Sequence, residues 1–517
     1  MSNVLGGAPH RVALRTTFLS GTALLSAGLF GLAAPASADQ QFLKHGSLVV
    51  SSSIYDNTQG PVATLKVGTP LANTETATTP AVDGNNYVTV WGNENADASF
   101  GVTSVIQLTD IDLSNGKVFR SMQVPADQVV TSFSSKSELG LHVLNNWPKV
   151  GVTFVGYANA GVGNIDVSNS DAVPGQDKTN PVTFAFGKDF AFRRTIVTVD
   201  EKASITYTPT NNYGGNNGRS ALLGSNGLYY MVGNANNGDA ATFGSASNGT
   251  SPDVTETTGL NVVAPINASV VNATIASAAS AEVDPLLEFN DNKGKADKPG
   301  KDNNYRGLTE FDGALFFTKG SGSNGMNTVY TVNAPNSLPT VNNAASSTIS
   351  VVPGFPTDPA RTAGGDFTPF AVFFANPTTM YVTDEGSGDA TDVSSHAGLQ
   401  KWTLGSDGSW HLQYVLTKGL IGVVDSNVTG SDGPWPAITT VGLRNLTGRI
   451  NGDGTVTLWA TTSTSSASVD NGADPNKVVE ITDKIAATQS SQVGNESFTT
   501  IAGPVYRTVF RGVGFVE

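Results

Sequence analysis

The sequence predicts an all-β protein built from repeated antiparallel units of four strands. Glycine and proline supply 57 and 25 of the 517 residues, a share above the average for globular proteins that indicates many turns. Short β-branched and aromatic segments alternate with these turns, and several are preceded by Asn-Gly or Asp-Gly, which are strong hairpin signals. One such pattern recurs seven times, so the repeat itself is the main evidence for the architecture.

Each copy contains a strand that follows a turn and ends in a small polar loop. The seven copies are residues 48–56, 87–94, 152–158, 229–235, 315–321, 380–386 and 456–462. A second hairpin often follows, for example 106–112 with 117–121 and 399–404 with 410–415. Two hairpins per copy make four strands, and seven such units in series predict a seven-bladed β-propeller. A β-sandwich or a two-domain β protein is the alternative.

The copies are spaced more widely along the sequence than compact blades require. Residues 39–517, taken as one propeller domain, give more residues per copy than compact blades of roughly 40–50 residues need. We expect the surplus in long loops near 158–217, 234–303 and 331–366, which are rich in Gly, Asn, Ser and Thr.

The two ends of the domain are predicted to meet in one blade. The copy at 48–56 has too little chain before it for a full first strand, while the C-terminal segment 510–517 resembles 305–311, which opens another copy. We therefore expect the C-terminal strand to pair with the N-terminal strand and to complete the first blade, which removes two exposed sheet edges. Deletion of 510–517 should then collapse the fold.

The N-terminus has the features of a secretory signal peptide over residues 1–38. Arg11 and Arg15 precede an apolar run from 18 to 34, and Ala36-Ser37-Ala38 follows as a small-residue cleavage site. An uncleaved membrane anchor is the alternative. The signal predicts an exported protein, secreted, periplasmic or at the cell surface, that is not inserted in a membrane after cleavage.

Charge and composition exclude several classes of partner and chemistry. The formal net charge is −14, which argues against nucleic acid and anionic membranes as partners. Cysteine is absent, so disulfides, thiolate nucleophiles and Cys-ligated metals are excluded. The chain also lacks the His-Glu-x-x-His, Gly-x-Ser-x-Gly and phosphate-loop motifs.

Basic residues at the starts of the first strands form the candidate ligand site. In an antiparallel blade, the start of the first strand and the end of the second lie on the same face of the disc. A polar funnel there would bind a carboxylate, sulfate or phosphate through its arginines; alternatively, the arginines pair with acidic residues or carbonyls and lock neighbouring blades. The predicted binding residues are Arg219, Arg306, Arg444, Arg511, Lys319 and Glu94.

The acidic loop 384–392 is the candidate metal site. Asp384, Glu385 and Asp389 lie on a Gly-rich turn, and such oxygen ligands suit calcium. His396, just after this loop, is the one histidine we considered as a base or ligand. The spacing does not match an EF-hand, and a solvated acidic loop explains the residues equally well.

Three segments resemble known propeller proteins. Residues 369–372, 380–384 and 398–402 resemble the blade pattern of NHL-type propellers, and 305–309, 315–320 and 442–448 are similar to secreted microbial propeller proteins of unsettled activity. The resemblance spans most of 45–517 and implies the fold but no activity. Calcium-dependent lactonases and lyases have similar blades, but their ligand sets are not matched here.

The sequence therefore leaves three functions open. The first is a binding module that holds an anionic small molecule, a glycan or an extracellular protein on its arginine-bearing face. The second is a calcium-dependent hydrolase or lyase that uses Asp384, Glu385 and His396. The third is a structural protein of the cell surface or matrix, which the Thr-, Ser-, Asn- and Gly-rich composition favours.

Overall fold

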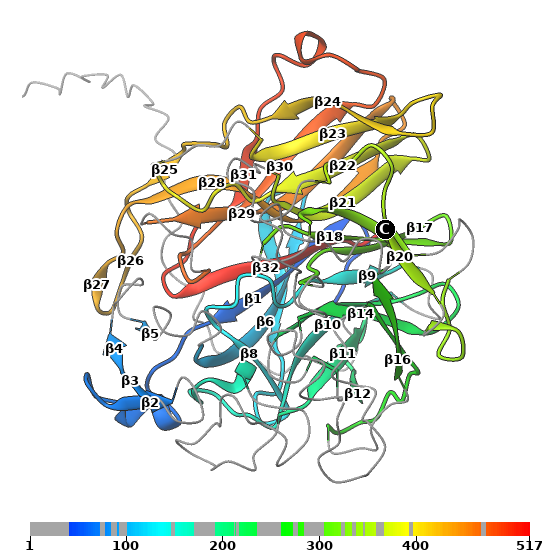
Figure 1. Cartoon of the computed structure of the whole chain (residues 1–517). Helices are drawn as coiled ribbons and strands as arrows, with labels where there is room; N and C mark the ends of the chain where they lie inside the picture. Colours follow the sequence, from blue (N-terminus) through cyan, green and yellow to red (C-terminus); the bar gives the residue numbers. More distant parts are fainter. Residues whose placement is uncertain are drawn as a thin grey trace, which may run out of the picture. The chain divides into compact units, whose positions relative to one another are not determined.

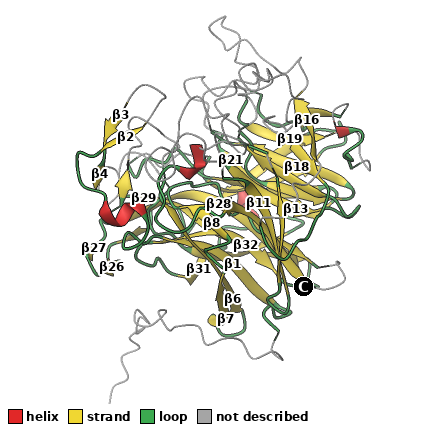
Figure 2. Ribbon diagram, turned by 90° about the horizontal axis from the view of Figure 1, so that it is seen from below, coloured by secondary structure: helices red, strands yellow, loops and turns green. Residues whose placement is uncertain are grey.

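The chain is all-β in the computed structural model, and the described residues belong to the compact unit Ala38–Glu517. Figure 2 shows that strands dominate, and the described helical segments are the short 3-10 turns η1 (Pro61–Thr64), η2 (Val167–Asn169) and η6 (Ser490–Gln492). The structure describes residues 41–72, 78–83, 90–92, 101–145, 150–169, 192–210, 212–213, 217–234, 260–271, 278–283, 304–321, 326–332, 338–344, 347–357, 367–391, 396–466 and 472–517.

Hydrogen bonds join the strands into sheets of nine, eight, five and four strands and three two-stranded sheets. Within the four larger sheets, the antiparallel pairings delimit six units of four strands (Figure 1). In order from the inner strand, unit 1 is β32 (Thr508–Phe515), β1 (Ser47–Ile54), β6 (Thr103–Asp112) and β7 (Lys117–Gln123). Unit 2 is β9 (His142–Leu144), β10 (Gly151–Ala158), β11 (Arg194–Asp200) and β12 (Ile205–Pro209).

The other four units follow the same meander. Unit 3 is β13 (Gly218–Leu223), β14 (Tyr229–Gly233), β15 (Leu260–Val263) and β16 (Ala278–Val283). Unit 4 is β17 (Leu308–Phe311), β18 (Ala314–Lys319), β19 (Thr328–Val332) and β20 (Thr348–Val351). Unit 5 is β21 (Pro369–Asn376), β22 (Thr379–Asp384), β23 (Gly398–Leu404) and β24 (Trp410–Leu416). Unit 6 is β28 (Ile438–Ile450), β29 (Thr455–Ser465), β30 (Val478–Lys484) and β31 (Thr499–Ala502).

The remaining strands either pair with strands of these units or form separate two-stranded sheets. β8 (Val129–Ser132) pairs with both β6 and β10, and β25 (Val424–Asp425) pairs with β28. The two-stranded sheets are β2 (Pro70–Ala72) with β3 (Thr78–Pro80), β4 (Val82–Asp83) with β5 (Trp91–Gly92), and β26 (Thr429–Gly430) with β27 (Gly433–Pro434).

The inner strands close a ring. β32 contacts β9, β9 contacts β13, and the contacts continue through β17, β21 and β28 back to β32. The core lies between neighbouring sheets; between units 4 and 5, for example, Phe311 stacks on Phe374 with ring centroids 4.4 Å apart. A propeller-like ring of small antiparallel sheets is therefore the architecture, as radial packing of twisted sheets requires.

The predicted closure by the chain ends is confirmed. β32 pairs antiparallel with β1, with Leu48 opposite Phe515 and Ile54 opposite Thr508. β1 pairs on its other side with β6. The first unit is thus assembled from both ends of the domain.

The predicted number of seven units was wrong for the described strands, which form six. The copy at 87–94 lies mostly outside the described residues, and its described part, β5, pairs with β4 in a two-stranded sheet. Because β1 pairs directly with β6, the hairpin of β6 and β7 is the outer half of the first unit. The described strands between β1 and β6 are those of the two-stranded sheets β2 with β3 and β4 with β5.

The predicted long loops were also partly wrong. The segment 158–217 contains β11 and β12, 234–303 contains β15 and β16, and 331–366 contains β20. These are mostly outer strands, which are short and carry many small or polar residues. Their composition therefore resembles that of loops, and the sequence pattern did not identify them as strands. Residues 1–40, which include the predicted signal peptide, lie outside the described residues.

Candidate functional site

Basic side chains from different units converge around one carboxylate, that of Glu385. Arg219 is the second residue of β13, Arg306 precedes β17, and Arg444 lies within β28. Arg219 and Arg306 lie at the starts of inner strands, as the sequence predicted, whereas Arg444 lies in the middle of one. Lys136 joins them from the turn between β8 and β9. We call Lys136, Arg219, Arg306, Arg444 and Glu385 the central cluster.

Glu385 bridges three of these cations. Its Oε1 accepts a hydrogen bond from Nη1 of Arg306, and its Oε2 lies 3.4 Å from Nε of Arg444 and 3.7 Å from Nζ of Lys136. Burial opposes ionisation of this side chain, but Arg306, Lys136 and Arg444 hold the pKa of Glu385 at about 2. These contacts are the ion pairs between neighbouring units that were the alternative to a ligand site.

The backbone around Glu385 is fixed by a close approach of units 5 and 6. A Cβ added to Gly442 would lie 2.3 Å from the carbonyl carbon of Glu385. Gly386 has φ +75°, and a Cβ there would lie 2.3 Å from the carbonyl oxygen of Val441. Only glycine fits both positions, so the backbone at Glu385 is held between units 5 and 6.

Arg219 stands beside a second buried carboxylate. Its Nη1 donates to Oδ1 of Asn304 and to the carbonyl of Tyr305, at 3.2 Å for the latter. Burial and the charge of Arg306 lower the pKa of Arg219 to about 9, although Glu138 acts in the opposite direction. Glu138 itself accepts hydrogen bonds from the hydroxyl of Tyr157 at 2.5 Å and from Nδ2 of Asn217 at 2.7 Å.

Four cations and several carboxylates meet at this site. Glu385 and Glu138 act on these cations, and Asp474 also acts on Arg444. Burial and the guanidinium groups of Arg306, Arg444 and Arg219 together lower the pKa of Lys136 to about 8, against the attraction of Glu385. The side chain of Lys136 is 29% exposed, whereas those of Arg306 and Arg444 are 2% and 4% exposed. Lys136 is therefore more accessible to solvent than these two arginines, and a ligand from solution would reach its ammonium group first.

Two polar atoms of the cluster have no hydrogen-bond partner among the described residues. They are the buried Nε atoms of Arg219 and Arg306. Buried donors of charged groups are normally satisfied, so the cluster retains donor capacity that no group in the described part of the chain uses.

The other predicted binding residues hydrogen-bond groups outside the central cluster or cannot be placed. Arg511 donates from Nη2 to the carbonyls of Phe133 and Gly472 and from Nε to Oγ of Ser53, and so secures β32. The buried Nζ of Lys319 donates to Oδ1 of Asn327 at 3.0 Å. Glu94 lies outside the described residues.

The predicted calcium ligands point to different partners. Oxygens of Asp384 accept hydrogen bonds from the backbone of Thr368 and Gly386 and from Nε2 of Gln400, at 2.9–3.2 Å. Burial raises the pKa of Asp384 to about 7. Oδ1 of Asp389 accepts two hydrogen bonds from Thr391. Across the described ranges, no three His, Asp or Glu side chains are grouped so that they would hold a metal ion.

Sequence reasoning missed Lys136 and Glu138. Both lie in the short polar segment 134–138 between β8 and β9, outside the repeated strand pattern. A lysine and a glutamate in a Ser-rich turn resemble any solvated loop, so only the ring geometry reveals their role.

Comparisons with known proteins add little to this description. No protein-family model and no curated protein matches the sequence. Similar solved structures include a triple arginine mutant of AofleA from Arthrobotrys oligospora, with 10% identity, a TM-score of 0.27, and coverage of 74% of this chain and 92% of that one. RS223-Beta-xylosidase has 12% identity, a TM-score of 0.28, and coverage of 69% and 98%.

The hemagglutinin-neuraminidase ectodomain of parainfluenza virus 5 has 10% identity, a TM-score of 0.34, and coverage of 83% and 88%. Since all these TM-scores lie below 0.5, none of the likenesses bears on function. The propeller-like architecture rests on the strand pairings themselves. Within the described part of the chain, no helix has the length and apolar character needed to cross a membrane.

Proposed function

We propose that this protein is an exported, propeller-type binding module that holds an anionic ligand at the central cluster. The observation that supports the proposal is the convergence of four cations from separate units around Glu385. Guanidinium and ammonium groups in a partly desolvated site bind carboxylates, sulfates and phosphates through charge-assisted hydrogen bonds. Export is inferred from the leader-like sequence at 1–38.

Lys136→Met tests the proposal with the least disturbance of the fold. The side chain is partly exposed and comes from a turn, so its loss leaves the inner strands unchanged. One charge-assisted hydrogen bond contributes about 1.5–3 kcal/mol, which corresponds to a roughly ten- to hundredfold weaker affinity. Calorimetry with sulfate, phosphate and acidic sugars measures this change.

Lys477→Met is the matched control. Nζ of Lys477 lies 2.8 Å from Oδ2 of Asp425, and the two side chains are 5% and 29% exposed. The control removes a buried lysine from a one-to-one ion pair and should leave anion binding unchanged. If the unmodified protein binds none of these anions, or if both variants bind them equally well, the proposed function is wrong.

A further inference from the structure

A second buried charged cluster joins units 5 and 6 and is not used by the proposed function. Lys401 lies in β23, and Asp483 precedes the last residue of β30. Nζ of Lys401 lies 2.9 Å from Oδ2 of Asp483, and both side chains are 0% exposed. The same Nζ contacts the hydroxyl of Tyr414 at 3.0 Å and the carbonyl of Lys484 at 2.6 Å. An amine and a carboxyl group are thus held together away from water.

Asp483 is also surrounded by proton donors. The hydroxyl of Tyr381 donates to its Oδ2, and that of Tyr414 donates to its Oδ1 at 2.8 Å. Glu496 shares a side-chain hydrogen bond with Asp483; burial and this neighbour raise the pKa of Glu496 to about 8. Glu496 therefore carries a proton at neutral pH. Burial also lowers the pKa of Lys401, against the attraction of Asp483.

We propose that Lys401 and Asp483 form an amide bond, a covalent cross-link between units 5 and 6 that arises in the folded protein. The three requirements are a buried amine, a carboxyl group in contact with it, and a third group that moves protons between them. The amine is that of Lys401, the carboxyl group is that of Asp483, and the proton-transfer group is Glu496. Burial lowers the pKa of Lys401 and so favours its neutral amine, which is the reactive nucleophile.

The reaction balances without an oxidant or a co-reactant. The ammonium of Lys401 first passes a proton to the carboxylate of Asp483, and the free amine nitrogen then attacks Cγ. Hydroxyls of Tyr381 and Tyr414 stabilise the negative oxygen of the tetrahedral intermediate, as oxyanion donors do. Glu496 donates its proton to the departing hydroxyl and takes one from the nitrogen. A C–N bond forms, a C–O bond breaks, and one water molecule leaves.

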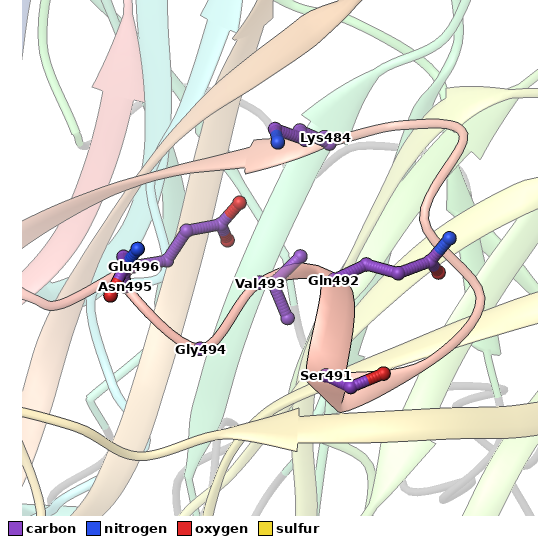
Figure 3. Close-up of a pocket in the computed structure, with 7 residues that line it drawn as sticks. All are labelled: Lys484, Ser491, Gln492, Val493, Gly494, Asn495 and Glu496. Carbon is purple, nitrogen blue, oxygen red and sulfur yellow. The ribbon is translucent and has the colours of Figure 1, made fainter.

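A cavity next to Glu496 can receive the water molecule that amide formation releases. The cavity has a volume of about 440 Å³ and is lined by Lys484 and residues 491–496. Figure 3 shows Lys484 and Glu496 on facing segments around it. The apolar residues Leu399, Leu416 and Ile481 of the same cluster keep the reacting groups themselves dry.

The cross-link would serve a chain that lacks disulfides. Cysteine is absent, and the two residues are 82 positions apart. Closing so long a loop restricts the unfolded chain and thereby stabilises the folded one.

Mass spectrometry of the full-length folded protein tests the proposal. We expect an intact mass lower than the sequence mass, after any leader is removed, by one water molecule. Proteolysis should release a branched peptide that contains both Lys401 and Asp483. The pair Lys477 and Asp425 is an internal control: it is equally close, but its aspartate is 29% exposed, so it should stay unlinked.

Glu496→Gln tests the proton transfer. The glutamine amide can still donate a hydrogen bond to Asp483, so the variant should fold, but it cannot exchange a proton with the reacting atoms. We expect its intact mass to match its sequence, with no branched peptide. Unbranched peptides from the unmodified protein would overturn the cross-link whether or not the variant folds, and equal cross-linking in the variant would overturn the role of Glu496.

Discussion

The strand that closes the ring should dominate the stability of the first unit, and Phe515→Ala measures its contribution. Phe515 ends β32 and is 6% exposed. Its ring stacks on that of Trp459 of unit 6, with centroids 5.2 Å apart and 7° between the planes. Truncation to alanine removes buried apolar surface and leaves a cavity that β-strand backbones cannot fill, which costs about 3–5 kcal/mol. Domains are stable by only about 5–15 kcal/mol, so the effect should be large.

Urea unfolding followed by tryptophan fluorescence measures the loss, and Phe119→Ala is the control. Phe119 lies in β7 of the same unit, but its side chain is 42% exposed. Surface substitutions of this kind change stability by about 0.5 kcal/mol or less. We expect a marked fall in the unfolding midpoint for Phe515→Ala alone. Equal midpoints for the two variants would refute the reasoning that closure by β32 holds the ring together.

Two further predictions concern a buried acid and a close backbone contact. Burial raises the pKa of Asp110 to about 6, while its Oδ2 accepts a hydrogen bond from the backbone of Lys44 at 2.9 Å. The folded state then binds more protons than the unfolded state between the ordinary value of 3.8 and about 6, so Asp110 destabilises the protein as pH rises through that window. From pH 4 to 7, the melting temperature of Asp110→Asn should rise relative to that of the unmodified protein. A difference in melting temperature that does not change with pH would contradict this. A Cβ added to Gly512 would lie 2.4 Å from the backbone nitrogen of Leu141, so Gly512→Ala should lower Tm clearly more than Gly452→Ala, whose Cβ meets nothing within 4 Å.

Much of the fold could be predicted because β-strands leave a local signature. Six of the seven copies coincide with second strands of units, such as β10 at Gly151–Ala158 and β22 at Thr379–Asp384. The copy at 87–94 lies mostly outside the described residues, and its described part, β5, pairs with β4 rather than in a unit. Strand pairing is a non-local property, and one sequence window does not contain it.

The residues of the candidate site were likewise predictable only in part. Arg219, Arg306 and Arg444 were predictable because each precedes the second strand of its copy in the sequence, although Arg444 lies in the middle of β28 rather than at its start. Lys136 was not, since it lies in a turn outside the repeat. The contact between Lys401 and Asp483 was equally invisible, because it joins the third strand of one unit to the third strand of the next.

By itself, the sequence determined the all-β class and the meander of short strands, because hydrophobic patterns and turn residues act over a few neighbouring positions. The pairing of the chain ends was predictable only because 510–517 repeats the start of another copy. Tertiary structure decided how many units complete the ring, which cations surround Glu385 and which lysine meets a buried aspartate. These outcomes depend on packing between sheets that are distant in the chain, where burial and charge act through space rather than along the backbone.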